Sequence, residues 1–168
     1  MTSANTTIDR LDWDGIGTQL DAEGFCLLPG ILDASAARNL ARQQQTAKAT
    51  QSIPLHAADL GCADVLYFDA SLPAPLDTWR TAFYRHLAVI ANRWNETLGV
   101  DSRYPAELED FLRRNQKAGQ TRRQSHLSRL GVEGHMPLHQ RNDGSKCFPC
   151  KSLRCCPSRA LIFRGASS

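Results

Sequence analysis

Residues 75–98 read PLDTWRTAFYRHLAVIANRWNETL, and they contain the longest helical pattern of this chain. Large apolar residues recur there at steps of three or four, the spacing that places them on one face of an α-helix. We therefore predict a long amphipathic helix over this range, with its apolar face in the core. The residues of that face are Leu76, Trp79, Phe83, Leu87, Ile90, Trp94 and Leu98.

The chain before this helix alternates capping residues with short apolar segments. Asp12 is a typical N-cap for a first helix, and Gly24 is a typical stop for it. Residues 25–28 then predict a strand that a Pro-Gly turn closes. Asp33 caps a second predicted helix, and residues 65–68 predict a second strand.

The chain after the long helix changes from a helical period to a strand period. Pro105 opens one more predicted helix, and Gly119 ends it. Two short strands are predicted next, over residues 126–130 and 136–139. Because helices come first and strands follow, the order indicates an α+β fold rather than an alternating parallel sheet. The apolar positions expected in the last helix are Leu108, Phe111 and Leu112.

Composition places the chain among ordinary globular proteins. Its 168 residues suffice for one domain with a core, and 42% are hydrophobic and 22% charged. No apolar run is long enough for a transmembrane helix, and the first residues lack a signal-peptide pattern. We therefore expect a cytoplasmic protein that does not contact a membrane, with its cysteines reduced.

Positive charge is concentrated in the last third of the chain. From Arg113 onward there are 12 Lys and Arg residues, against only Glu133 and Asp143. Such an excess is typical of proteins that bind nucleic acid or another anion, and it also occurs on an ordinary solvated surface.

The sequence loses its periodicity at Phe148-Pro149-Cys150. Four of the six cysteines fall between Cys147 and the end. With His135 and His139, Cys147 and Cys150 satisfy the ligand types and spacings of a tetrahedral zinc site. One hypothesis is therefore a small zinc-binding module with a basic, nucleic-acid-binding tail. The tail lacks the interleaved aromatic residues of a stacking platform, so we expect no nucleic-acid partner on this basis.

A second hypothesis rests on Leu138-His139-Gln140, which is followed by Asp143-Gly144 and Phe148-Pro149. This stretch resembles the metal-binding strand of bacterial iron(II)- and 2-oxoglutarate-dependent oxygenases of the proline-hydroxylase-like group. The resemblance extends over residues 11–149. It includes the helix, strand, Pro-Gly turn and helix at the N-terminus, and the segment Leu66-Tyr67-Phe68-Asp69.

The resemblance implies a fold and a function. The fold is a helical support layer followed by the first strands of a double-stranded β-helix, of the jelly-roll or cupin type, here incomplete. The cofactors are iron(II) and 2-oxoglutarate, and the substrate is a prolyl group or a small molecule such as an amino acid. His139 matches the first iron ligand. Arg141 occupies the usual place of the carboxylate ligand, so Asp143 is the nearest acidic candidate. The family also uses a second histidine ligand of the iron and an arginine that binds 2-oxoglutarate, and neither has a counterpart in this chain.

The resemblance stops at residue 149, and a shift of reading frame explains why. With suitable codons, one base inserted after the Pro149 codon converts the tail into FPLQVAALLSEPRADFPGGEF, which has a strand pattern and a turn. We therefore divide the chain into an oxygenase-like part, residues 1–149, and a frameshifted tail, residues 150–168, without regular structure. The chain as given is expected to be inactive as a dioxygenase.

Overall fold

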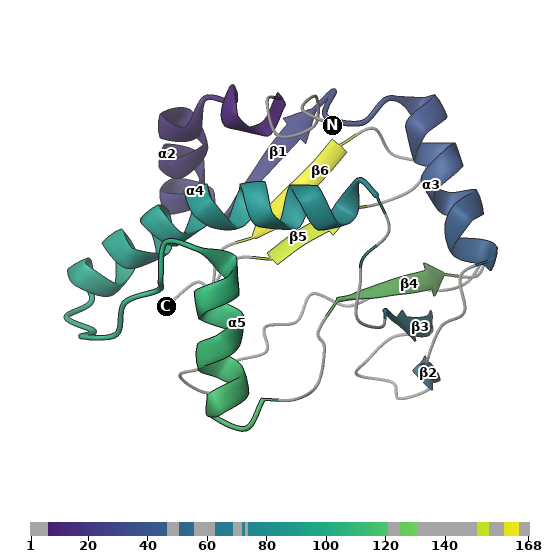
Figure 1. The fold of residues 1–168 in the computed structure, drawn as a ribbon. Helices are drawn as coiled ribbons and strands as arrows, with labels where there is room; N and C mark the ends of the chain where they lie inside the picture. The colour runs from purple at the N-terminus through teal and green to yellow at the C-terminus, as the bar shows by residue number, and fades with distance from the viewer. Residues whose placement is uncertain are drawn as a thin grey trace.

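The computed structural model describes residues 7–46, 51–55, 63–68, 72, 74–120, 125–130, 151–154 and 160–164. Figure 1 shows helix α4 crossing the middle of the molecule, with α2 beside strand β1 and with α5 below α4. The helices are α2 (Trp13–Glu23), α3 (Ala34–Thr46), α4 (Leu76–Thr97) and α5 (Leu108–Lys117). The strands are β1 (Phe25–Pro29), β2 (Gln51–Leu55), β3 (Ala63–Tyr67), β4 (His126–Leu130), β5 (Lys151–Arg154) and β6 (Ala160–Arg164).

Local capping sets the ends of the first two main helices, as the sequence predicts. The Asp12 carboxylate accepts a hydrogen bond from the Gly15 N–H at 3.0 Å at the start of α2. Gly24 ends α2 with a φ of 71°, a left-handed conformation that glycine adopts without strain. At the start of α3, the Asp33 carboxylate accepts hydrogen bonds from the N–H groups of Ser35 and Ala36.

The main core lies between α2, α4 and β1. Strand β1 alternates between buried and exposed positions, with Cys26 and Leu28 buried. These two residues pack with the apolar faces of the two helices, which confirms the prediction for most of α4. The buried members of this cluster are Ile8, Ile16, Leu20, Cys26, Leu28, Trp79, Ala82, Phe83, Leu87 and Ile90.

A second, smaller cluster joins α4 to α5. It contains Tyr84 and Ala88 from α4 and Leu108 and Phe111 from α5. The two aromatic rings lie 5.4 Å apart between centroids. This cluster fixes the position of α5 against α4 and therefore the position of the connection between them.

Four residues that the sequence places in the core are not fully buried. Two of them lie at the ends of the predicted long helix, where Leu76 is only partly buried and Leu98 is 61% exposed. Trp94 is only partly buried, because it lies near the end of α4, where the helix continues past the main core. Leu112 is 44% exposed, because α5 contacts α4 through Leu108 and Phe111. Helix α5 also begins three residues later than Pro105.

The described strands form two antiparallel sheets, one with the order β1-β6-β5 and one with the order β2-β3-β4. Strands β3 and β4 confirm two predicted strands, whereas β2 was not predicted. Pro54 lies within β2. Its position is compatible with β2 at the edge of its sheet, where a missing N–H donor costs no hydrogen bond. Whether these sheets belong to a double-stranded β-helix stays a prediction.

Strands β5 and β6 correct one expectation. The sequence predicted no regular structure after residue 150, yet β6 pairs with β1 and with β5. Leu27 lies opposite Ile162, and Ile162 lies opposite Leu153. These strands were missed because the cysteines and arginines of this segment follow neither the helical nor the strand period. The proposed shift of reading frame stays a prediction.

Candidate functional site

The metal ligands predicted from the sequence lie outside the described residues. These are His139 and Asp143 of the iron hypothesis, and His135, Cys147 and Cys150 of the zinc hypothesis. Within the described part of the chain, no group of three His, Cys, Asp or Glu residues could hold a metal ion. The two metal assignments therefore stay predictions, and the described geometry concerns the helical layer.

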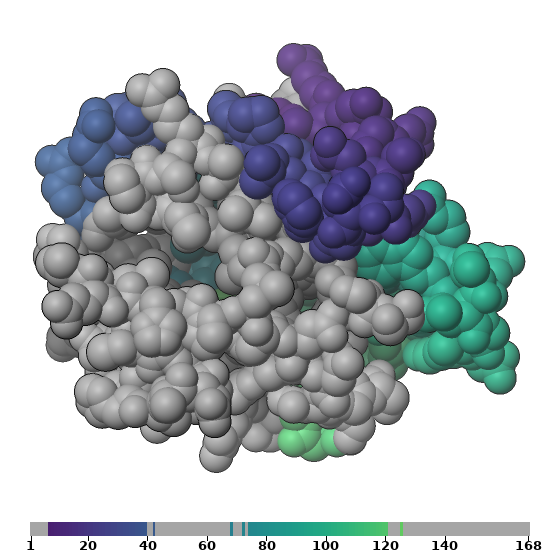
Figure 2. Space-filling view, turned by 180° about the vertical axis from the view of Figure 1, so that it is seen from behind, coloured from purple at the N-terminus to yellow at the C-terminus, as the bar shows by residue number. Residues whose placement is uncertain are grey.

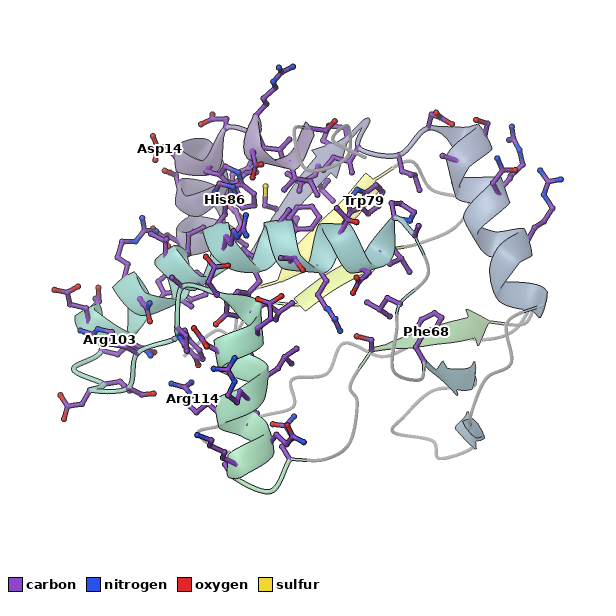
Figure 3. The ribbon with its side chains drawn as sticks, in the orientation of Figure 1. Asp14, Phe68, Trp79, His86, Arg103 and Arg114 are labelled. Carbon is purple, nitrogen blue, oxygen red and sulfur yellow. The ribbon has the colours of Figure 1, made fainter. Side chains whose placement is uncertain are left out.

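His86 on α4 connects the N-terminal segment to the helical layer. Its imidazole stacks on the Trp13 indole, with 4.2 Å between centroids and 6° between planes. Its Nε2 lies 3.0 Å from a carboxylate oxygen of Asp9. The Trp13 indole N–H donates to the carbonyl of Ile8 at 3.0 Å. Figure 3 shows His86 on the side of α4 that faces α2. These contacts assign His86 to packing.

Asp21 links α2 to the second half of α4. One carboxylate oxygen accepts from Arg93 Nη2 and the other from the Trp94 indole N–H, both at 2.6 Å. Charge-assisted hydrogen bonds of this length are stronger than neutral ones. Trp94 therefore has a polar role in addition to its partial burial.

Asn92 and Tyr84 hold the connection between α4 and α5. The Asn92 amide donates to the Tyr104 carbonyl at 3.0 Å and accepts from the Tyr104 N–H at 2.7 Å. The buried Tyr84 hydroxyl donates to the Pro105 carbonyl at 2.8 Å. Burial raises the pKa of Tyr84 to about 12, so the hydroxyl stays a donor at neutral pH.

Two arginines meet at this connection. The Arg114 guanidinium on α5 donates from Nη1 to the Arg103 carbonyl at 2.6 Å. It also lies 5.7 Å from the ring centroids of Tyr104 and Phe111, a cation–π distance. Figure 3 shows Arg103 and Arg114 on the same side of the molecule, beside the α4–α5 connection. This region can therefore attract anions.

Cys26 is the described residue with the most nucleophilic side-chain type, and its setting suppresses reactivity. The side chain is buried, and burial raises the pKa of its thiol. Its Sγ lies 2.8 Å from the Gln19 Oε1, to which the thiol donates. We therefore assign Cys26 to the core and not to catalysis.

The sequence located part of this region. Arg114 belongs to the basic excess that begins at Arg113, but Arg103 precedes it and was missed. No local pattern could place Arg103 beside Arg114, because their approach depends on tertiary contacts. Asn92 and Tyr84 hold the connection against α4. None of the described helices is long and apolar enough to cross a membrane.

Comparison with known proteins identifies an oxygenase family. Its model, described as "Oxygenase, catalysing oxidative methylation of damaged DNA", matches residues 63–165, more than half of the chain. The match includes α4, α5 and the strands from β3 to β6, and it continues across residue 150.

Two curated relatives come from Mycobacterium tuberculosis. They are the uncharacterized protein MT2286 of strain CDC 1551 / Oshkosh and the uncharacterized protein Rv2227 of strain H37Rv. Each is 32% identical over 85 residues, which is 51% of this chain and 36% of the relative. The chain thus matches little more than a third of the length of these relatives. No solved structure matches it.

Proposed function

Because the chain belongs to the oxygenase family described as catalysing oxidative methylation of damaged DNA, we propose that it is an iron(II)- and 2-oxoglutarate-dependent oxygenase of damaged DNA bases. The family match over residues 63–165 is the observation that carries this proposal. The sequence resemblance around Leu138-His139-Gln140 supports the cofactor pair. The substrate class differs from the prolyl group that this resemblance implies, since the family description refers to DNA.

The chemistry of the donor set fits iron(II). In the proposed site His139 and Asp143 hold the metal, and an imidazole with a carboxylate is typical of non-haem iron oxygenases. Bound iron supplies dioxygen activation coupled to oxidation of 2-oxoglutarate. One oxygen atom ends in succinate and the other in a hydroxyl group of the substrate, and carbon dioxide is released.

We propose that the helical layer supports this site from outside. Helix α4 shares the main core cluster with β1, to which it contributes Trp79, Phe83 and Leu87, and α5 is joined to α4 through a second cluster that contains Tyr84. A rigid layer of this kind fixes the strands that carry a site, and precise positioning of ligands is what metal affinity requires. The layer itself carries no proposed catalytic residue.

The test measures succinate formation with iron(II), 2-oxoglutarate and three substrates: a methylated DNA oligonucleotide, the unmethylated oligonucleotide and a prolyl peptide. We expect the methylated DNA to give the largest stimulation, and His139→Ala to abolish it. His86→Gln is the matched control, because His86 stacks on Trp13 and pairs with Asp9 in the helical layer. Stimulation by the prolyl peptide alone would replace the DNA proposal.

Two assigned side-chain ligands bind iron less tightly than three. We therefore expect little or no turnover in the 168-residue chain, as the sequence predicts, and higher turnover in a variant with the reading frame restored after Pro149. Equal activity of both forms would contradict the proposed shift of reading frame. A lack of activity in both forms, with iron bound, would contradict the proposed function.

A further inference from the structure

Three cations gather where α4 connects to α5 and along α5. Arg103 lies in the connection, and Arg114 and Lys117 lie on α5, one helical turn apart. We call these three residues the basic ridge. Arg103 and Arg114 are adjacent, since the Arg114 guanidinium donates to the Arg103 carbonyl. Figure 2 shows the end of α4 and the following connection, in teal, as an outer edge of the molecule below α2.

The neighbouring arginines form ion pairs with carboxylates, whereas the cations of the basic ridge do not within the described residues. Nearby, Arg85 pairs with Glu107 at 3.3 Å, and Arg113 pairs with Asp110 at 2.9 Å. Among the described residues, no carboxylate forms an ion pair with Arg103, Arg114 or Lys117. Within the described part of the chain, the ridge therefore carries positive charge that no carboxylate pairs.

Both arginines are held in place by neutral contacts. Arg103 donates from Nη1 to the Val100 carbonyl at 2.9 Å. Arg114 is held by the Arg103 carbonyl and by the rings of Tyr104 and Phe111. Side chains that are already ordered lose less conformational entropy on binding. A carbonyl or an aromatic ring orients a guanidinium without cancelling its charge.

The simplest alternative is stabilisation of the helix. Cations near the C-terminus of a helix interact favourably with its macrodipole, and the acidic residues Glu109 and Asp110 lie in the first turn. This interaction accounts for the position of Lys117 and, in part, for that of Arg114. It does not explain Arg103, which lies in the connection before α5.

The sequence beyond the ridge continues the positive charge. Residues 118–149 contain five Lys and Arg residues and two acidic residues. This excess precedes residue 150, so it does not depend on the tail. A polyanion is the partner that suits a continuous excess of cations.

On the basis of the proposed function, we propose that the basic ridge binds the phosphate backbone of the DNA substrate. Phosphate contacts position a nucleic acid without reading its sequence. The ridge would therefore set where the damaged strand lies, while selection of the base takes place elsewhere. Its contribution to affinity should be electrostatic and should weaken with salt.

The experiment measures binding of fluorescent single- and double-stranded oligonucleotides by anisotropy, from 50 to 300 mM salt, without iron or 2-oxoglutarate. We expect Lys117→Gln and Arg103→Gln each to reduce the slope of log K against log salt by about 0.7 to 0.9. Lys117→Arg keeps the charge and should retain the slope. Circular dichroism would verify that each variant keeps its helix content.

Arg42→Gln is the matched control. Arg42 is an exposed cation on α3, which Figure 1 shows on the opposite side of the molecule from the α4–α5 connection. It undergoes the same change of charge, and we expect an unchanged slope. A slope that falls equally in Arg42→Gln, or in none of the variants, would overturn the ridge as the contact surface.

The result of this binding experiment is independent of the test of the proposed function, because no turnover is measured. Loss of binding in the ridge variants supports the ridge even if the chain fails to oxidise DNA. Unaltered binding in these variants contradicts the ridge even if methylated DNA is oxidised. Binding of a polyanion such as heparin with the same slope change, but no binding of DNA, would contradict DNA as the partner.

Discussion

Single polar side chains hold the helical layer together at defined points. Asp21 joins α2 to α4, and Asn92 and Tyr84 join α4 to the connection that leads to α5. Each of these contacts spans many residues of sequence and satisfies a polar group. At this scale the hydrogen bonds of Asn92 and Tyr84 between distant segments matter more than the ion pairs, since the ion pairs are exposed and contribute little each.

Tyr84→Phe tests how much one buried hydrogen bond contributes to the free energy of unfolding. The change removes the hydroxyl that donates to the Pro105 carbonyl and leaves the ring in place against Phe111. We expect a loss of about 1–2 kcal/mol in the free energy of unfolding, measured by urea denaturation. In the wild type, a spectroscopic pH titration should show Tyr84 ionising near pH 12. An unchanged free energy would mean that water replaces the hydroxyl.

Asp33 should make the start of α3 sensitive to acid. Hydrogen bonds from the Ser35 hydroxyl, and from the N–H groups of Ala36 and Ser35, lower the pKa of this carboxyl from its ordinary 3.8. A carboxyl with a lowered pKa stabilises the folded state above its ordinary pKa and loses that contribution as the pH falls through the lowered value. Thermal melts followed by circular dichroism between pH 5 and pH 2.5 should therefore show a smaller decline for Asp33→Asn. An identical decline in both proteins would contradict this role.

Helix α4 is the element on which the layer depends. Its apolar face packs against both α2 and β1, and a second face contacts α5. The apolar residues of α4 therefore belong to two different clusters, which are spread along its 22 residues. The C-terminal end of α4 is less buried than its middle. There Trp94 donates a hydrogen bond to Asp21 and also makes apolar contacts.

Phe83→Ala should destabilise the protein strongly, because Phe83 is 5% exposed within the main core. Loss of a buried phenylalanine costs about 3–5 kcal/mol, through lost burial and the cavity that remains. Val89→Ala is the control on the same helix. Val89 is 70% exposed, and a surface substitution changes the free energy of unfolding by at most about 0.5 kcal/mol. Similar losses in the two variants would contradict the assigned orientation of α4.

For Trp94→Ala, the structure revises the loss of about 3–5 kcal/mol that applies to a core tryptophan. The residue is partly buried, so a smaller loss is expected than for Phe83→Ala. Trp94→Phe, which removes the N–H donor to Asp21, separates the polar part of the loss from the apolar part. A Trp94→Ala loss as large as that of Phe83→Ala would show that the end of α4 is as well packed as its middle.

At the scale of the whole molecule, the strands connect distant parts of the chain. Strand β1 near the N-terminus pairs with β6 near the C-terminus over five residue pairs, from Phe25 with Arg164 to Pro29 with Ala160. The family match also continues to residue 165. Strand pairing of this kind makes β1 dependent on the tail for its backbone hydrogen bonds.

Deletion of residues 151–168 tests this dependence. The structure predicts a lower melting temperature, because removal of β5 and β6 leaves an edge of β1 unpaired. An unchanged melting temperature would favour the division of the chain at residue 150 that the sequence suggests. Differential scanning calorimetry of the two chains distinguishes these outcomes.

Local signals in the sequence were enough to predict the helices and several of their ends. The three- and four-residue period of α4 and the caps at Asp12, Gly24 and Asp33 are local signals, and each was confirmed. Such signals suffice because a helix forms its hydrogen bonds between residues close in sequence. The family match likewise confirmed that the chain belongs to an oxygenase family, while the iron ligands His139 and Asp143 stay predictions.

Which residues meet depends on contacts between distant parts of the chain. The pairing of β1 with β6, the partial exposure of Trp94 and the approach of Arg103 to Arg114 each depend on segments far apart in sequence or on where a neighbouring element ends. No local period encodes such contacts, because a strand finds its hydrogen-bond partners, and a side chain its burial, in another part of the chain. For that reason the basic excess was visible in the sequence, but the position of the basic ridge was not.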